Sequence, residues 1–118
     1  MYIISKEFHF SASHILNGLK NDHPCKRLHG HNYVITFYFK SEELNEVGFV
    51  IDYRDLDPIK KYLDDVFDHR HLNDIMPGVN PTAENIAKFL HDTFKAQFPL
   101  LFKVEVCETP KTKAFYEA

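Results

Sequence analysis

The chain has 118 residues, 44% hydrophobic, 26% charged and 14% aromatic, an ordinary globular composition that excludes disordered, collagen-like and low-complexity proteins. This length supports one domain, which we expect to cover residues 1–118. The net charge of −3 argues against a nucleic-acid or membrane partner, whereas 8 His in so short a chain suggest metal or proton chemistry.

Two alternating segments predict a pair of long strands. In residues 2–14, one face carries Phe8, Phe10, Ala12 and His14. Residues 29–40 alternate in the same way and are rich in β-branched and aromatic residues. Residues 15–28 between them have no clear period, and a connection of this length is more often functional than a simple hairpin turn.

Two helices are expected in the middle of the chain. In residues 53–66 the apolar residues recur at a spacing of three or four, as in an amphipathic helix. Residues 68–80 are rich in His, Asn and Gly and are predicted to form a loop. A second helix is predicted to begin at residues 81–82, with Thr82 as its N-cap, and to be stopped by Pro99.

Two further strands are expected at the end of the chain. Residues 102–108 alternate, and residues 114–116 follow after a turn. The predicted order is therefore β-β-α-α-β-β. Helices segregated from antiparallel strands define the α+β class.

Three histidines are expected to meet at one end of the first strand pair. His29 and His31 flank Gly30, and residues i and i+2 of a strand project from one face roughly 6–7 Å apart. If the first two strands pair antiparallel, His14 lies beside them. Three neutral imidazoles with an open fourth position are typical of a catalytic zinc. The alternative is three histidines bonded to backbone groups at the rim of the sheet.

The long connection between these strands carries a second candidate group. Cys25 precedes His29 by four residues. A thiolate close to a metal has a lowered pKa and can act as a base or a nucleophile. Two alternatives stay open: an unreactive loop thiol, or a fourth zinc ligand that would make the site structural.

Two acidic residues complete the set of candidates. Asp68 can orient His69 as an acid–base partner only if the loop folds them together, and His71 is a rival within the same segment. Glu108 ends an apolar strand face, and its two oxygens match the paired N–H donors of a guanidine-like ring edge. The alternative for both carboxylates is simple solvation.

The sequence also bears on the cellular compartment. Cys25 and Cys107 are too few for a disulfide framework. The first residues lack the basic and apolar regions of a secretory signal, and no apolar run reaches the length of a membrane span. We expect a cytoplasmic protein with reduced thiols.

Taken together, six motifs resemble the 6-pyruvoyl-tetrahydropterin synthase superfamily. They occur in order along most of the chain, in residues 10–14 (FSASH), 25–33 (CKRLHGHNY), 50–53 (VIDY), 68–73 (DHRHLN), 81–85 (PTAEN) and 108–109 (ET). The Cys-x-x-x-His-Gly-His spacing resembles the bacterial branch, the 6-carboxy-5,6,7,8-tetrahydropterin synthases of queuosine biosynthesis.

The resemblance implies the tunnelling fold, a four-stranded antiparallel sheet with two helices on one face. Subunits of this fold join edge to edge into an oligomeric β-barrel, so we expect a trimer-based homo-oligomer, a hexamer.

The resemblance also implies a reaction. The substrate would be 7,8-dihydroneopterin triphosphate, and the products 6-carboxy-tetrahydropterin, acetaldehyde and triphosphate. The implied roles are zinc binding for His14, His29 and His31, proton transfer for Cys25, Asp68 and His69, and substrate binding for Glu108 and Thr82. The alternatives are a 6-pyruvoyl-tetrahydropterin synthase, which stops before carbon–carbon cleavage, and a non-catalytic pterin- or metal-binding module.

Overall fold

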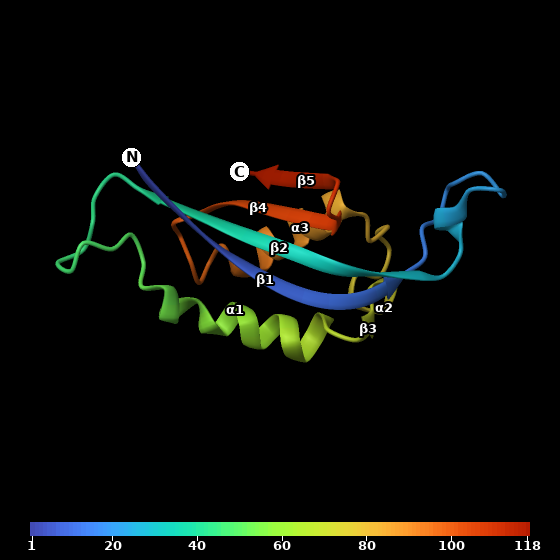
Figure 1. Ribbon diagram of the computed structural model, residues 1–118, viewed down its shortest axis with the longest axis horizontal. Helices are drawn as coiled ribbons and strands as arrows, with labels where there is room; N and C mark the ends of the chain where they lie inside the picture. Colours follow the sequence, from blue (N-terminus) through green and yellow to red (C-terminus); the bar gives the residue numbers. More distant parts are fainter.

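Two long antiparallel strands run through the whole fold, which a computed structural model describes for residues 1–118 (Figure 1). β1 and β2 pair in one unbroken register, from Tyr2 opposite Ser41 to His14 opposite His29. The complete sheet has the order β3-β1-β2-β4-β5. Its strands are β1 (Tyr2–His14), β2 (His29–Ser41), β3 (Arg70–His71), β4 (Leu101–Thr109) and β5 (Thr112–Glu117).

The four predicted antiparallel strands are confirmed, but the sheet has a fifth strand that the sequence did not reveal. β3 pairs in parallel with β1, with Arg70 opposite Ala12 and His71 opposite Ser13. A strand of two residues has no period to detect. His69, at a φ of 58°, turns the chain into β3, and the fully buried Leu72 secures the segment after it. The predicted loop over residues 68–80 is therefore wrong for β3 and for the short helix α2 (Leu72–Ile75).

The first predicted helix is present but is built from three kinds of turn. A 3₁₀ turn (η2, Tyr53–Leu56) leads into α1 (Asp57–Tyr62), and a π-helical turn (η3, Leu63–Phe67) ends it. In the last turn the N–H of Asp68 donates to the carbonyl of Leu63 at 2.8 Å, five residues back. Such turns frequently occur at functional sites, and this one delivers Asp68 to the edge of β1.

The second predicted helix is confirmed at its start and shorter at its end. α3 (Ala83–Phe94) begins where expected, because the Thr82 hydroxyl accepts the Asn85 N–H at 3.2 Å as an N-cap. The helix ends before Pro99, the predicted stop. The ammonium group of Lys95 donates to the carbonyls of Pro99 and Leu101, and these bonds accompany the turn of the chain into β4.

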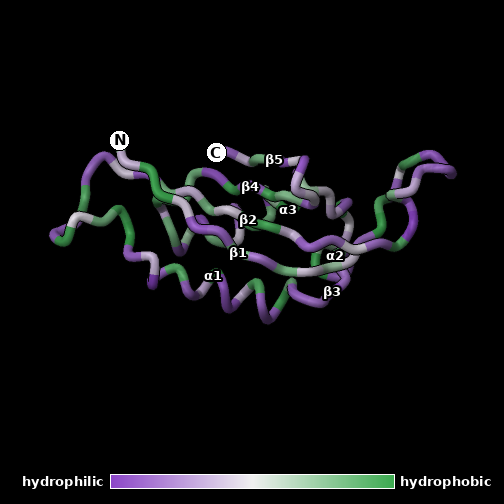
Figure 2. The backbone as a smooth tube through the Cα atoms, in the orientation of Figure 1, coloured by the Kyte–Doolittle hydropathy of each residue, from purple (hydrophilic) through white to green (hydrophobic).

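The helices cover one face of the sheet, as the family resemblance implied. The apolar residues of that face and of the helices form one core cluster, which includes Phe10, Phe37, Phe67, Ile86, Leu90 and Val104. Buried and more exposed residues alternate along much of β1 and β2, and both hydrophobic and hydrophilic residues occur along each of these strands (Figure 2). The buried face of β1 ends on His14, which is completely buried, so the core extends to the histidine end of the sheet.

Phe37 joins the sheet to α3 at the centre of this core. It is fully buried and packs edge-to-face on Phe8 and Phe94, with ring centroids 5.6 and 5.8 Å away. We expect Phe37→Ala to lower the free energy of unfolding by about 3–5 kcal/mol, measured by urea denaturation at fixed protein concentration. Phe49→Ala, at an exposed turn, is the control and should cost about 0.5 kcal/mol or less. Equal losses would contradict this account of the core.

The sheet of one chain is open, so it does not form the barrel by itself. Residues of β1 before Ala12 pair only with β2, and β5 pairs only with β4, which leaves two unpaired edges. None of the helices combines the length and apolar character that crossing a membrane requires.

Candidate functional site

His14, His29 and His31 meet at the end of the first strand pair, as their spacing predicted. The β1–β2 register places His14 opposite His29 and Ala12 opposite His31. One ring nitrogen of each histidine lies within 4.8 Å of the others, so the three could hold a metal ion. Gly30 allows the two strands to approach, since a Cβ there would lie 3.2 Å from the carbonyl oxygen of Ala12.

The hydrogen bonds of His14 and His29 leave the Nε2 atom of each ring unprotonated, with a free lone pair. His14 Nδ1 lies 2.8 Å from the carbonyl oxygen of Pro81, and His29 Nδ1 lies 2.7 Å from that of Arg27. A carbonyl only accepts, so each Nδ1 carries the hydrogen. The Nε2 atoms, 2.8 Å apart, then face each other without a proton between them. A cation resolves this repulsion, and carbonyl-bonded imidazoles are the usual form of metal-binding histidines.

His31 and Glu108 support the same conclusion. His31 Nε2 is buried and has no hydrogen-bond partner. The Glu108 carboxylate oxygen is 3.1 Å from this atom, out of hydrogen-bonding alignment, and 3.8 Å from His14 Nε2. A carboxylate beside two of the three clustered imidazoles favours a cation at the centre. The structure therefore places Glu108 at the histidine cluster itself.

The surroundings of His14 keep its ring neutral. Burial lowers the pKa of His14, and charge on His29 and His31 lowers it further, against the raising effects of the Pro81 carbonyl and of Glu108. A neutral imidazole is the form that binds metal. The buried Tyr33 hydroxyl lies 3.3 Å from His14 Nδ1 and is a contact that the sequence did not suggest.

Asp68 and His69 form a pair on the other side of β1. Asp68 accepts the Ser11 N–H at 2.9 Å with one oxygen and lies 2.8 Å from His69 Nδ1 with the other. The Ser11 N–H, followed by His69, lowers the pKa of this carboxyl, so it stays ionised at neutral pH. His71 instead contacts the Ser13 hydroxyl at 3.0 Å. The structure thus pairs His69, rather than His71, with Asp68.

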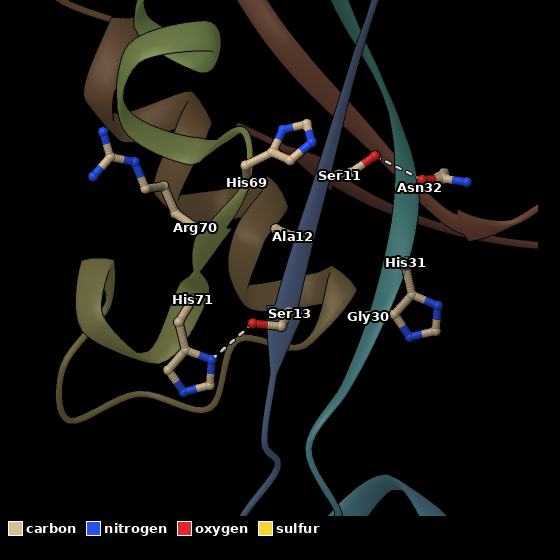
Figure 3. A pocket seen from close by; sticks show the side chains of 9 residues that line it. All are labelled: Ser11, Ala12, Ser13, Gly30, His31, Asn32, His69, Arg70 and His71. Carbon is tan, nitrogen blue, oxygen red and sulfur yellow. Dashed lines mark hydrogen bonds between the residues drawn. The ribbon is translucent and has the colours of Figure 1, made fainter.

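A polar cavity of about 590 Å³ extends across three adjacent strands (Figure 3). Residues 69–71 line it beside β3, residues 11–13 come from β1 and residues 30–32 from β2. In Figure 3, His69 and His31 lie on opposite sides of β1. The cavity lining thus includes one member of the metal-competent cluster and one member of the Asp68–His69 pair.

Cys25 lies apart from both groups in a single chain. It occupies a 3₁₀ turn (η1, Pro24–Lys26) of the connection over residues 15–28, which extends as an arm beyond the end of the sheet (Figure 1). Its thiol is free and half-buried, and its side chain makes no hydrogen bond with the histidine cluster or with Asp68 and His69. The structure does not assemble these groups within one chain.

Thr82 caps helix α3 and directly follows a residue that contacts the histidine cluster. Its hydroxyl caps α3, as predicted, and the preceding residue, Pro81, supplies the carbonyl that holds His14. The contact between Pro81 and His14 was not predicted from the sequence. Every residue has a backbone carbonyl, so residue type gives no sign of which carbonyl will bind a side chain.

The fold and this site define a class: an α+β domain with a three-histidine, metal-competent centre at one end of an open sheet. The family model for 6-pyruvoyl tetrahydropterin synthase matches residues 3–118. A 6-carboxy-5,6,7,8-tetrahydropterin synthase of Synechocystis is 38% identical, over 98% of this chain and 93% of the relative. The corresponding Bacillus subtilis protein is 30% identical, over 96% and 83%.

A solved structure gives the same result. The 6-pyruvoyl tetrahydropterin synthase of Caenorhabditis elegans superposes with a TM-score of 0.84 at 29% identity, over 100% of this chain and 97% of that one. This chain therefore belongs to the 6-pyruvoyl tetrahydropterin synthase family and has its tunnelling fold.

Proposed function

We propose that this protein is a zinc-dependent 6-carboxy-5,6,7,8-tetrahydropterin synthase. It would convert 7,8-dihydroneopterin triphosphate into 6-carboxy-tetrahydropterin, acetaldehyde and triphosphate, in the cytoplasmic synthesis of 7-deazaguanines such as queuosine. The observation that carries the proposal is the histidine cluster, whose inner nitrogens face one another as lone pairs beside Glu108. The names of the Synechocystis and Bacillus relatives favour this product.

Zinc is the proposed cofactor because the three ligands are imidazoles. His14, His29 and His31 would hold it and leave a position open, which is the pattern of catalytic zinc sites. When bound there, zinc would polarise the side-chain hydroxyls of the substrate and lower their pKa.

The remaining residues would bind the substrate and move protons. Glu108 would accept two hydrogen bonds from the amino-pyrimidine edge of the pterin, with Thr82 assisting at the same end of the sheet. Cys25 would transfer protons at the side-chain carbons. His69 would act as its acid–base partner, and Asp68 would orient the His69 ring through the 2.8 Å contact to Nδ1.

We also propose that the active protein is a homo-oligomer built from one tunnelling-fold domain per chain. Large apolar side chains are exposed on both unpaired edges of the sheet, Tyr2 and Ile3 on β1 and Phe115 on β5. An open edge of this kind favours pairing with another strand, and closure into a barrel removes it. A trimer-based hexamer would also allow Cys25 of one chain to approach Asp68 and His69 of another.

The identity of the products tests the proposed function. We expect purified protein with zinc to release acetaldehyde and triphosphate from 7,8-dihydroneopterin triphosphate, measured by chromatography of the pterin and by an aldehyde assay. A pyruvoyl product without acetaldehyde would assign the chain to the pyruvoyl synthases. Binding of the pterin without turnover would indicate a non-catalytic module and refute the proposal.

A further inference from the structure

Two asparagine side chains hold the base of the arm that carries Cys25. Asn73 Oδ1 accepts the N–H of Ile15 at 2.9 Å, and its Nδ2 donates to the carbonyl of the same residue at 2.8 Å. Asn80 makes the equivalent pair with Asn17, both at 2.8 Å. Each amide thus satisfies the donor and the acceptor of one backbone residue, as a neighbouring strand would.

Leu16, between Ile15 and Asn17, forms its backbone hydrogen bond on the opposite side of the chain. The N–H of Leu16 donates to the carbonyl of Cys25 at 3.2 Å. In an extended chain, successive residues offer their backbone groups to alternate sides. Residues 15–17, which follow the end of β1 at His14, therefore bond as an extended segment, with the two amides along one side and the Cys25 backbone along the other. This arrangement fixes the backbone of Cys25 relative to the end of β1.

The two amides come from segments that also hold the other groups of the site. Asn80 precedes Pro81, whose carbonyl accepts from His14, and the Asn80 carbonyl accepts from the Asn85 side chain of α3 at 2.9 Å. Asn73 lies in α2, directly after β3 and the Asp68–His69 pair. The arm is thereby tied to the histidine cluster through one amide and to the Asp68–His69 segment through the other.

We propose that Asn73 and Asn80 are positioning residues that hold the Cys25 arm in register with the metal centre. The inference deepens the proposed function and rests on it for the role of Cys25. Neither amide touches the histidine cluster, so both act through the arm. Small displacements of a reacting group lower the rate of the chemical step far more than they weaken substrate binding.

The test uses Asn73→Ala and Asn80→Ala, made in a Cys107→Ser background so that Cys25 is the one reactive thiol. We expect each variant to lower kcat roughly 10- to 100-fold with much less change in KM. We also expect a severalfold faster alkylation of Cys25 by iodoacetamide, because the freed arm exposes a half-buried thiol. Zinc content should stay at the parent level. If the alanine variants fold poorly, Asn73→Asp and Asn80→Asp take their place. They keep the size of the side chain but lose its N–H donor, and they should show the same changes in kcat and alkylation rate.

Asn17→Ala is the matched control. It removes an exposed amide from the same arm, while the backbone of residue 17 keeps both bonds to Asn80. This variant should match the parent in alkylation rate and kcat. Parent-like alkylation and turnover in the Asn73 and Asn80 variants would overturn the proposal. Loss of zinc would overturn it too, because the amides would then act on the histidine cluster, for Asn80 through Pro81, and not on the arm. If the parent protein shows no turnover, the proposed function is refuted, but the role of the two amides can still be tested by the alkylation rates of Cys25.

Discussion

His31→Ala should bind zinc far more weakly than the parent protein and should lose nearly all of its activity. Only two imidazoles would remain, and His31 Nε2 is the buried nitrogen for which the chain itself supplies no hydrogen bond. Loss of a catalytic metal removes several kcal/mol of transition-state stabilisation, so we expect kcat to fall on the order of 10³-fold or more. Metal content by plasma emission spectroscopy and triphosphate release measure the two effects separately.

His9→Ala provides the control for this substitution. His9 is also on β1, but it lies on the opposite face from His14, is exposed, and its ring has a polar contact only with the Glu7 carboxylate, at 3.2 Å. The His9 variant should keep its zinc and its melting temperature. A His31 variant that retains stoichiometric zinc and normal turnover would show that the cluster is not the metal site. The three histidines would then be rim residues of the sheet, two of them held by backbone carbonyls.

The histidine cluster was predictable because strand periodicity is a local property. Alternation in the first two strands was sufficient to place Phe10 and His14 on one face. Antiparallel pairing then brought the end of one strand to the start of the next, so His14 met His29 without any knowledge of the helices. The N-cap of α3 was predictable for a similar reason, since Thr82 and Asn85 interact within one turn.

Contacts between segments far apart in the chain were not predictable in the same way. The His14–Pro81 bond, the pairing of β3 with β1 and the bonds of Asn73 and Asn80 to the arm each join residues more than 50 positions apart. None of them depends on a repeating pattern. The first helix was predicted from its apolar spacing, but its π-helical end was not, although that turn places Asp68 beside Ser11.

Cys25 shows that the structure of a single chain does not bring all the proposed catalytic groups together. The sequence places it four residues before His29, yet the structure extends it on an arm, away from the Asp68–His69 pair on the other side of β1. Proton transfer needs donor and acceptor within hydrogen-bond reach, directly or through one water. We therefore propose that the arm meets the pair of a neighbouring subunit, which links the catalytic proposal to the proposed oligomer.

Cys25→Ala should retain zinc but lose turnover. Removal of a general acid–base group lowers kcat roughly 10²- to 10⁴-fold, and the histidine cluster does not use the Cys25 side chain. Cys107→Ala is the matched control, because the Cys107 thiol lies on β4, where it contacts Glu105 at 3.6 Å. That variant should remain active. Loss of zinc from the Cys25 variant would instead identify the thiol as a fourth ligand and the site as structural.

Mixing two inactive variants tests whether the Cys25 of one chain works with the Asp68 of another. Cys25→Ala chains keep Asp68, and Asp68→Asn chains keep Cys25. If the site forms between subunits, oligomers refolded from both will contain some interfaces with an intact thiol and an intact Asp68–His69 pair. Activity should then reappear in the mixture and be absent from either variant alone. A mixture that forms mixed oligomers and stays inactive would require each chain to bring its own Cys25 to its own Asp68, by a movement of the arm from the position described above.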